Sequence, residues 1–468
     1  MFARTVLCSV FVAAVTPHGV ARAVAADARA CNFLTAPSDS CFLPFPDNFW
    51  FAPAWDASAP PSLTLQNESL PIDSSNNPID PDAGGYNALQ GFSPLGPIMS
   101  YIPGISLERS ELPRLWSIPS SLSAATPRSV ILNADTLQPV AHWVELDHSG
   151  DDSGTPLYDR ALITWPAARL ADAQRYIVAF RNLTDEGGVP IAPSDGFAAL
   201  KYNRTTDNDA LEASRPRFEA IFEALESVGW ARRDVSLAWD FTTNTQADLT
   251  RRFVHMRDDA FARIEAAGGV KYKITKIDNA PAANTSRRIF GSFSVPTYLP
   301  FDAVPSLDSR LVLDPATGLP VFQKFVDFDF EVVIPDSVAA AGKPAKVLQY
   351  GHGLFGDHGE VEENYLATFA NENGYVLAAT DWIGLSEYDE PTVIVMMAGG
   401  DGGFSDFRIV PDRLHQGMLN ALTLMRLITQ SAFTKDPAVT FQGSSVISTS
   451  PSDWHYNGNS QGGIMGGV

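Results

Sequence analysis

The chain has 468 residues, of which 45% are hydrophobic and 19% are charged. A chain of this length and composition buries a large core, is globular rather than disordered, and should divide into two or more domains. Its formal net charge of −21 creates a surface field that repels phosphate polyanions and anionic membranes, which disfavours nucleic acid as a partner.

The first 25 residues have the anatomy of a secretory signal peptide. Arg4 precedes an apolar run over residues 6–15, and small residues suited to cleavage stand near Ala25. The apolar run is about half the length needed to span a bilayer, and no later segment is long enough either. We therefore expect residues 1–25 to be removed and the mature chain to be secreted, periplasmic or at the cell surface, without a transmembrane segment.

The cysteine count agrees with export. Cys8 would leave with the signal peptide, so the mature chain would keep only Cys31 and Cys41. In an oxidising compartment these two should pair, and a bridge that closes so short a loop stabilises the fold by about 2 to 3 kcal/mol. Two cysteines are too few for a structural zinc site, and the acidic loops lack the ligand spacing of calcium motifs. We expect neither a metal nor a cofactor.

Residues 31–268 are expected to form a β-rich N-terminal domain with two helices. Between residues 130 and 200, short β-prone runs alternate with turn clusters, which is the rhythm of a small β-sandwich. Two stretches then place apolar side chains at helical spacing, and we interpret both stripes as core. The first stripe is Phe218, Ile221, Phe222, Leu225 and Val228, and the second is Leu249, Phe253, Met256 and Ala260.

From residue 270 onward, β-prone runs alternate with helical patterns. We expect strands over residues 272–277, 289–295, 328–334, 347–350 and 375–380 and another at Trp454, with helices over residues 361–371 and 412–429. This alternation predicts an α/β domain with a mostly parallel sheet and right-handed crossovers. The long connection from Gly384 to Pro411 holds apolar residues beside glycines, which suits a lid or an acyl-binding wall and is compatible with a short buried helix.

The pattern Gly458-Asn459-Ser460-Gln461-Gly462 matches the Gly-x-Ser-x-Gly of a nucleophile elbow. A serine on a sharp strand-to-helix turn sits in a strained backbone, and a Cβ at the flanking glycines would collide with neighbouring backbone. We therefore interpret Ser460 as a catalytic nucleophile.

A second motif strengthens this interpretation. The strand that ends at Tyr350 runs into Gly351-His352-Gly353-Leu354-Phe355-Gly356, a segment that we call the His–Gly turn. Such a turn can aim backbone N–H groups at a developing oxyanion, and each preorganised donor is typically worth about 3 to 4 kcal/mol of barrier.

The chain resembles the α/β-hydrolase fold, specifically secreted bacterial lipases and esterases with a β-rich N-terminal domain. The resemblance covers residues 270–468 and rests on the His–Gly turn, the segment Asp381-Trp382-Ile383-Gly384, the expected helix over residues 412–429 and the elbow. It implies hydrolysis of hydrophobic carboxylic esters through a Ser460 acyl-enzyme, with the backbone N–H groups of Leu354 and Gln461 as oxyanion donors.

In this family the acid and the histidine of the triad follow the serine, and residues 461–468 contain neither. The hydrolase domain is therefore expected to be truncated after the elbow, and residues 1–468 are expected to be nearly inactive. Four histidines are weighed as substitutes. We interpret His352 as shaping the His–Gly turn and His415 and His455 as structural, whereas His358 follows the turn and could reach the pocket mouth.

Three other functions stay open. The glycines of the His–Gly turn also match a dinucleotide fingerprint with Asp381 as the ribose-binding acid, but acidic residues crowd the helix start where the pyrophosphate would lie. These are Asp357, Glu360, Glu362 and Glu363. The remaining alternatives are a non-catalytic surface or binding protein with a vestigial elbow, and a serine peptidase on the same fold. The oligomeric state is left open.

Overall fold

The computed structural model describes residues 31–34, 42–52, 62–66, 70, 78–123, 127–300, 309–400 and 402–468. The chain divides into two compact units. Unit 1 comprises Met1–Leu249 with Gly402–Ser405, and unit 2 comprises Thr250–Asp401 with Asp406–Val468. The predicted signal peptide lies outside the described residues. So does Cys41, whereas its predicted partner Cys31 is half-buried, and the disulfide stays a prediction.

Unit 1 is built from antiparallel sheets. A four-stranded sheet has the order β5 (Pro139–Val140), β4 (Ser129–Asn133), β8 (Arg175–Arg181), β9 (Val235–Thr242). A three-stranded sheet has the order β3 (Ile98–Ser100), β7 (Leu162–Pro166), β6 (His142–Leu146), and β1 (Phe51–Ala52) pairs with β2 (Ser62–Leu63). The helices of this unit are α1 (Gly150–Ser153), α2 (Asp195–Lys201) and α3 (Asp209–Ser227).

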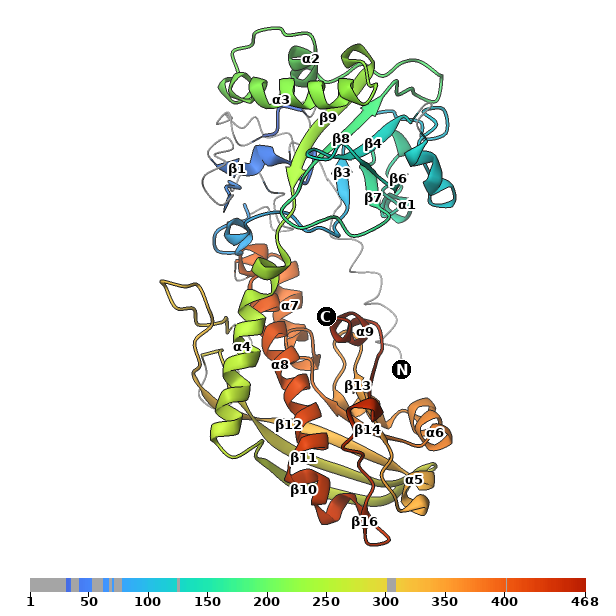
Figure 1. Ribbon diagram of the computed structural model, residues 1–468, viewed down its shortest axis with the longest axis vertical. Helices are drawn as coiled ribbons and strands as arrows, with labels where there is room; N and C mark the ends of the chain where they lie inside the picture. The colour runs from blue at the N-terminus through green and yellow to red at the C-terminus, as the bar shows by residue number, and fades with distance from the viewer. Residues whose placement is uncertain are drawn as a thin grey trace. The chain divides into compact units, whose positions relative to one another are not determined.

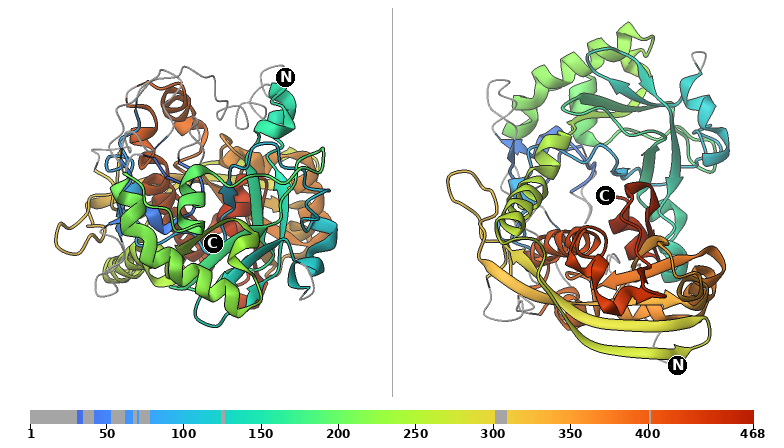
Figure 2. Two further views of the ribbon diagram at one scale, coloured as in Figure 1. Left: turned by 90° about the horizontal axis from the view of Figure 1, so that it is seen from above. Right: turned by 60° about the horizontal axis from the view of Figure 1, so that its bottom comes forward.

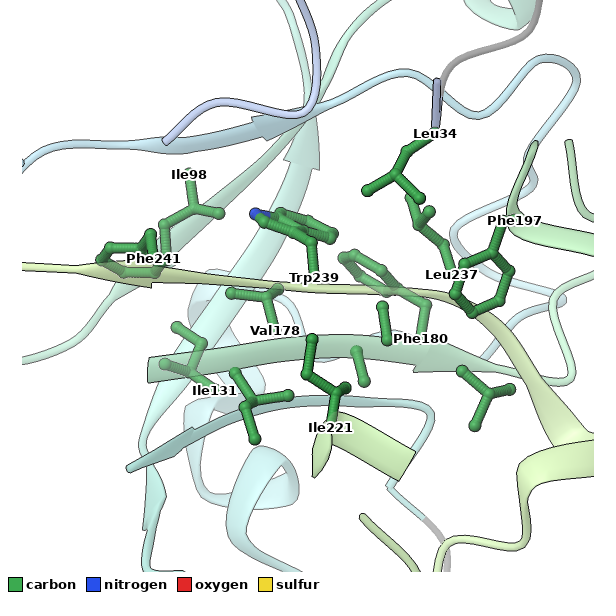
Figure 3. Packing of buried hydrophobic residues seen from close by; sticks show 14 of the residues in the cluster. Leu34, Ile98, Ile131, Val178, Phe180, Phe197, Ile221, Leu237, Trp239 and Phe241 are labelled. Atoms are coloured by element: carbon green, nitrogen blue, oxygen red, sulfur yellow. The ribbon is translucent and has the colours of Figure 1, made fainter. Parts of the chain in front are cut away.

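The core of unit 1 forms around the large side chains of β8 and β9. Phe180 and Trp239 are fully buried and their rings stack at 6.2 Å between centroids (Figure 3). Helix α3 adds the buried face that its apolar spacing predicts, which includes Phe218 and Ile221, although Val228 just past its end is 37% exposed.

Unit 2 contains one six-stranded mixed sheet. Its strand order is β10 (Tyr272–Ala282), β11 (Thr285–Thr297), β12 (Lys324–Pro335), β14 (Tyr375–Thr380), β13 (Lys346–Gly351), β17 (Trp454–Gly458). The first three pairings are antiparallel, and only β14 with β13 and β13 with β17 are parallel. The prediction of a mostly parallel α/β-hydrolase sheet is therefore wrong.

For the first of these pairings the physical reason is the connection between β10 and β11. Only Ala283 and Asn284 separate β10 from β11, and Asn284 has φ 64°, as a tight hairpin requires. A two-residue loop can only join antiparallel strands, because a parallel pair needs a crossover of a dozen or more residues. A second hairpin, β15 (Thr440–Phe441) with β16 (Ser444–Ser445), is antiparallel for the same reason.

Helices cover both faces of this sheet. On one face α4 (Gln246–Ala266) and α8 (Ile409–Gln430) lie side by side and share a core with β11 and β12 (Figures 1 and 2). On the other face α6 (Asn364–Asn373) packs on a smaller cluster. Neighbouring residues of β12 point to opposite faces of the sheet, as side chains of a strand alternate. Val332 belongs to the first cluster and Val333 to the second. The remaining helices are α5 (Asp336–Ala341), α7 (Glu390–Met397) and α9 (Gln461–Gly466).

Among the helices of the described residues, none combines the length and the apolar character needed to cross a membrane.

Candidate active site

The candidate nucleophile Ser460 lies between a strand and a helix. It follows β17 and is the N-cap residue of α9, and its backbone has φ 49° and ψ −114°. A serine in this region is strained and persists only where its surroundings fix the backbone. Ser460 is exposed, so the chain turns sharply from strand to helix around a residue open to solvent, which is the geometry that a nucleophile elbow requires.

Two glycines make this turn possible. A Cβ on Gly458 would lie 2.3 Å from the carbonyl carbon of Gly462, and a Cβ on Gly462 would lie 2.2 Å from the carbonyl oxygen of Gly351. Both contacts are with backbone that has no room to move. The glycines that the sequence pattern singles out are thus required by close packing at the elbow.

The His–Gly turn lies directly beside the elbow. Strands β13 and β17 are parallel neighbours with Gly351 paired to Gly458, so both loops leave the same edge of the sheet. The Asn459 N–H donates to the Gly351 carbonyl oxygen at 3.1 Å, and a Cβ on Gly353 would lie 3.3 Å from Asn459 Nδ2. The structure therefore brings together the two motifs that the sequence shows more than 100 residues apart.

Leu354 and Gln461 carry the two amides that are predicted to form the oxyanion hole. Within the described part of the chain, neither N–H donates a hydrogen bond. The Leu354 side chain is 37% exposed, whereas Gln461 is buried at the first position of α9. Unpaired amides on adjoining loops are what a developing negative charge needs, since donors used by other groups cannot stabilise it.

His352 acts on the turn and is not available as a base. The Trp382 N–H donates to its Nε2 at 2.8 Å, so Nε2 carries no proton and the Nδ1–H donates to the Gly353 carbonyl oxygen at 2.7 Å. Both ring nitrogens are used, and the ring is 1% exposed. This agrees with the interpretation that His352 shapes the turn, and it excludes proton transfer from Ser460 to this ring.

Glu360 is a part of the site that the sequence interpretation missed. It lies in the 3-10 helix η7 (His358–Glu362), and its carboxylate accepts hydrogen bonds from the Gly353 N–H at 3.1 and 3.3 Å. The Tyr350 hydroxyl lies 3.3 Å from the same carboxylate and 3.0 Å from the Tyr365 hydroxyl. The only sequence signal was an acidic residue close after a glycine-rich turn, and we weighed it solely as a charge that repels phosphate.

His358 forms an ion pair with Asp381, which follows β14. Its Nδ1 lies 2.8 Å from Asp381 Oδ1, and its backbone N–H donates to the same oxygen. Burial disfavours the charged ring, but the hydrogen bond and charge of Asp381, helped by Asp357 and Glu331, raise the pKa of His358 to about 9. Burial likewise favours the neutral form of Asp381, but the hydrogen bond from His358 outweighs it and lowers the pKa of Asp381.

This pair is unsuited to the role of triad base. At neutral pH the His358 ring is already protonated and cannot accept a proton from Ser460. Strand β13 also separates β14 from β17, and strands lie about 4.8 Å apart. Asp381, at the end of β14, therefore lies about 10 Å from β17.

His415 and His455 are held elsewhere in unit 2. His415 on α8 stacks on Phe253 of α4 at 6.1 Å, and burial, with a contribution from Arg252, lowers its pKa to about 4. His455 on β17 packs edge-on against Tyr375 at the start of β14, which is the opposite end of that strand from Asp381. The structure does not bring either ring to Ser460.

The connection after β14 contains helix α7, which packs against the His–Gly turn. Val393 and Met396 of α7 form a small apolar cluster with Phe355 and Leu385, and the Phe355 N–H donates to the Leu385 carbonyl oxygen at 2.9 Å. Ile394 on the same helix is 46% exposed. The helix is thus half-buried, and its interpretation as a lid or an acyl-binding wall stays a prediction.

The amide that a dinucleotide site would use at this edge is engaged within the chain. The Gly353 N–H, which a dinucleotide fingerprint would offer to a phosphate, is already occupied by the Glu360 carboxylate. Within the described ranges, no group of three or more His, Cys, Asp or Glu side chains is arranged to hold a metal ion.

The geometry of residues 351–360 and 458–466 is therefore what carries a functional proposal. Comparison of the chain with protein-family models and with curated proteins finds no match.

Proposed function

We propose that this protein is a serine hydrolase that cleaves carboxylic esters through an acyl-enzyme on Ser460. The single observation that carries the proposal is the strained and exposed Ser460 at the start of α9, packed beside the His–Gly turn. Backbone strain of this kind costs about 1 to 3 kcal/mol and clusters at functional sites. With ψ −114°, Ser460 also lies far from the ordinary left-handed region near ψ +47°.

In the proposed reaction the Ser460 Oγ attacks the carbonyl carbon of the ester. The carbonyl oxygen becomes an oxyanion that accepts hydrogen bonds from the N–H groups of Leu354 and Gln461. Collapse of this intermediate expels the alcohol and leaves the acyl group esterified to Ser460. Water then attacks the acyl-enzyme, releases the carboxylic acid and regenerates the serine.

The proton of Ser460 needs an acceptor that the four histidines weighed above do not provide. Both nitrogens of His352 are in use, His358 is protonated at neutral pH, and the other two lie away from the elbow. A serine without its base keeps only the oxyanion and binding contributions. We therefore expect low turnover from residues 1–468.

The same proposal includes hydrophobic esters as substrates, export of the mature chain and kinship with secreted bacterial lipases and esterases. The apolar cluster of Phe355, Leu385, Val393 and Met396 supports the first of these, because it adjoins the predicted oxyanion donor Leu354. A peptidase would use the same nucleophile, so amide substrates belong in the test.

The test is covalent labelling of the purified chain with a fluorophosphonate, combined with hydrolysis of p-nitrophenyl esters of increasing acyl length, both with imidazole at pH 8 as the base that the weighed histidines do not supply. We expect labelling at Ser460, identified by peptide mass, and loss of both signals in Ser460→Ala. Gly353→Val should slow both reactions, because its side chain enters the space next to Asn459. Exposed Ser452 provides the control, since Ser452→Ala should behave like the parent.

Labelling that persists in Ser460→Ala would refute the role of Ser460 and indicate another nucleophile. No labelling of the parent chain with imidazole present would favour a non-catalytic protein. Tight binding of NAD would favour the dinucleotide interpretation instead. Cleavage of p-nitroanilides as fast as that of esters would indicate a peptidase.

A further inference from the structure

Gly353 and Leu354 contribute two consecutive amides to the His–Gly turn, but these amides have different surroundings. The Gly353 N–H donates to the Glu360 carboxylate at 3.1 and 3.3 Å. The Gly353 carbonyl oxygen accepts from His352 Nδ1 at 2.7 Å and from the Gly356 N–H at 3.1 Å. Gly353 is thus held on both sides, by Glu360 at its nitrogen and by His352 and Gly356 at its oxygen.

These contacts determine the direction of the next amide. The Gly353 carbonyl and the Leu354 N–H belong to the same planar peptide, in which a trans bond points them in opposite directions. Fixing the carbonyl oxygen of Gly353 therefore fixes the Leu354 N–H. A glycine has the widest choice of backbone angles, because it has no side chain to restrict them. The hydrogen bond from the Gly353 N–H to Glu360 therefore limits the backbone rotation of Gly353.

The Glu360 carboxylate itself is held in a space that exists only because residue 356 is a glycine. A Cβ on Gly356 would lie 2.1 Å from Glu360 Oε1. The Tyr350 hydroxyl lies on the carboxylate's other oxygen, Oε2, at 3.3 Å. Asp357, the N-cap residue of η7, accepts from the Gly359 N–H and fixes the start of the helix that carries Glu360.

We propose that Glu360 is a positioning residue of the hydrolase, whose carboxylate orients the His–Gly turn so that the Leu354 N–H faces the oxyanion. The proposal rests on the proposed function of Ser460. Glu360 is not catalytic in this role, because its contacts are with the turn and not with reacting atoms. This role requires that residue 360 accept a hydrogen bond from the Gly353 N–H, and it does not require that residue 360 be charged.

The experiment compares the rate of fluorophosphonate labelling at Ser460 in the parent with that in Glu360→Gln, Glu360→Ala and Gly356→Ala, with the same concentration of imidazole at pH 8 in every reaction. Exposed Glu363, on the same segment, gives the matched control Glu363→Ala. Intact-mass time courses over a range of reagent concentrations separate the limiting labelling rate from the half-saturating concentration. Hydrogen exchange of peptides that cover residues 346–356 reports on the turn independently of any labelling.

We expect Glu360→Ala to lower the limiting rate roughly 10- to 100-fold with little change in the half-saturating concentration, since misplacing a group by about 1 Å can cost 100-fold. Glu360→Gln should stay close to the parent, because its amide oxygen still accepts from Gly353. Gly356→Ala should behave like Glu360→Ala, because its methyl group displaces the carboxylate. Faster exchange in residues 351–356 should accompany each loss, while Glu363→Ala changes neither quantity.

Labelling of Glu360→Ala and Gly356→Ala at the parental rate would overturn the proposal. Labelling of Glu360→Gln as slow as that of Glu360→Ala would also overturn it, because the charge of Glu360 and not its ability to accept a hydrogen bond would then matter. If Glu360→Ala loses its fold, the rate of Gly356→Ala relative to the parent decides. Absence of labelling in the parent would refute the function of Ser460 and not the positioning of the turn, which hydrogen exchange would still reveal.

Discussion

The elbow shows how single residues fix a strained serine. Gly458 and Gly462 lie on either side of Ser460, and each packs closely against other backbone. The atom nearest to a Cβ placed on Gly462 is the Gly351 carbonyl oxygen. The sequence predicted the need for small residues at these positions from the motif alone. It contained no sign that Gly462 packs against the His–Gly turn, because that contact joins residues more than 100 positions apart.

Glu360 was beyond the reach of sequence reasoning for a related reason. Periodic patterns indicate which side chains face a core, but Glu360 lies in a short 3-10 helix after an aperiodic turn. Its hydrogen bond to Gly353 depends on the path of the turn and not on residue spacing. The sequence indicated only its charge, and the expectation that this charge opposes a bound phosphate stays a prediction.

The His358–Asp381 pair predicts a specific dependence of stability on pH. The folded-state pKa of His358 is raised from 6.5 to about 9. Its contribution is therefore fully present below pH 6.5 and is lost as the pH rises through 9. We expect His358→Gln to reduce the free energy of unfolding of unit 2 by about 2 to 3 kcal/mol at pH 6, with the difference shrinking toward pH 9.

Hydrogen exchange in residues 346–351 and 375–380, measured from pH 6 to 9, follows unit 2 separately from unit 1. His148→Gln is the control, because that ring is 68% exposed and lies in unit 1. A destabilisation by His358→Gln that is equal at pH 6 and pH 9 would show that the ring is not charged in the folded state.

At the scale of elements, the sequence located strands better than it paired them. The runs at residues 289–295 and 328–334 lie inside β11 and β12, which are longer at both ends. Their direction was mistaken because alternation with helices was taken as the rule for the whole domain. The two-residue connection at Ala283 and Asn284 is the signal for a hairpin. The expected strand stopped at residue 277, whereas β10 continues to Ala282 with a bulge.

Strand β12 carries a buried acid that the antiparallel arrangement places between two other strands. Glu331 is 1% exposed. Burial and the neighbouring Glu362 carboxylate raise its pKa to about 8, and Arg288, which also pairs with Glu362 at 2.6 Å, offsets this only in part. Since the folded-state pKa exceeds the ordinary 4.5, ionising Glu331 opposes folding, and stability falls as the pH rises from 4.5 through 8.

Glu331→Gln should remove this loss. We expect the variant to be more stable than the parent at pH 9 by on the order of a few kcal/mol, and close to the parent at pH 5, where Glu331 is already neutral. Urea unfolding of unit 2 at both pH values, monitored by hydrogen exchange in residues 324–335, measures the difference in stability between the variant and the parent. Exposed Glu372 serves as control through Glu372→Gln. A variant less stable than the parent at pH 9 would contradict a neutral buried acid.

On the scale of the whole molecule, every residue discussed for the candidate site belongs to unit 2. The elbow, the His–Gly turn and Asp381 all follow strands that end at one edge of its sheet, because β13, β14 and β17 run parallel. That parallel part of the sheet is where the sequence interpretation was informative. The error in fold class concerns the direction of β10, β11 and β12, which carry none of the residues of the candidate site described above, so it leaves the proposed chemistry intact.

The chain therefore has a positioned serine and unpaired amides, while the histidines weighed for the role of base are all engaged elsewhere. If this assignment is correct, a base supplied from solution should restore part of the missing catalysis. We expect imidazole at pH 8 to increase the hydrolysis of p-nitrophenyl butyrate by the parent chain beyond its effect on Ser460→Ala, within the factor of about 10² to 10⁴ that a general base contributes. The rate should rise with the concentration of unprotonated imidazole. Rapid Ser460-dependent hydrolysis that imidazole does not accelerate would show instead that a histidine of the chain already serves as base, and single substitutions of His358, His415 and His455 would identify it.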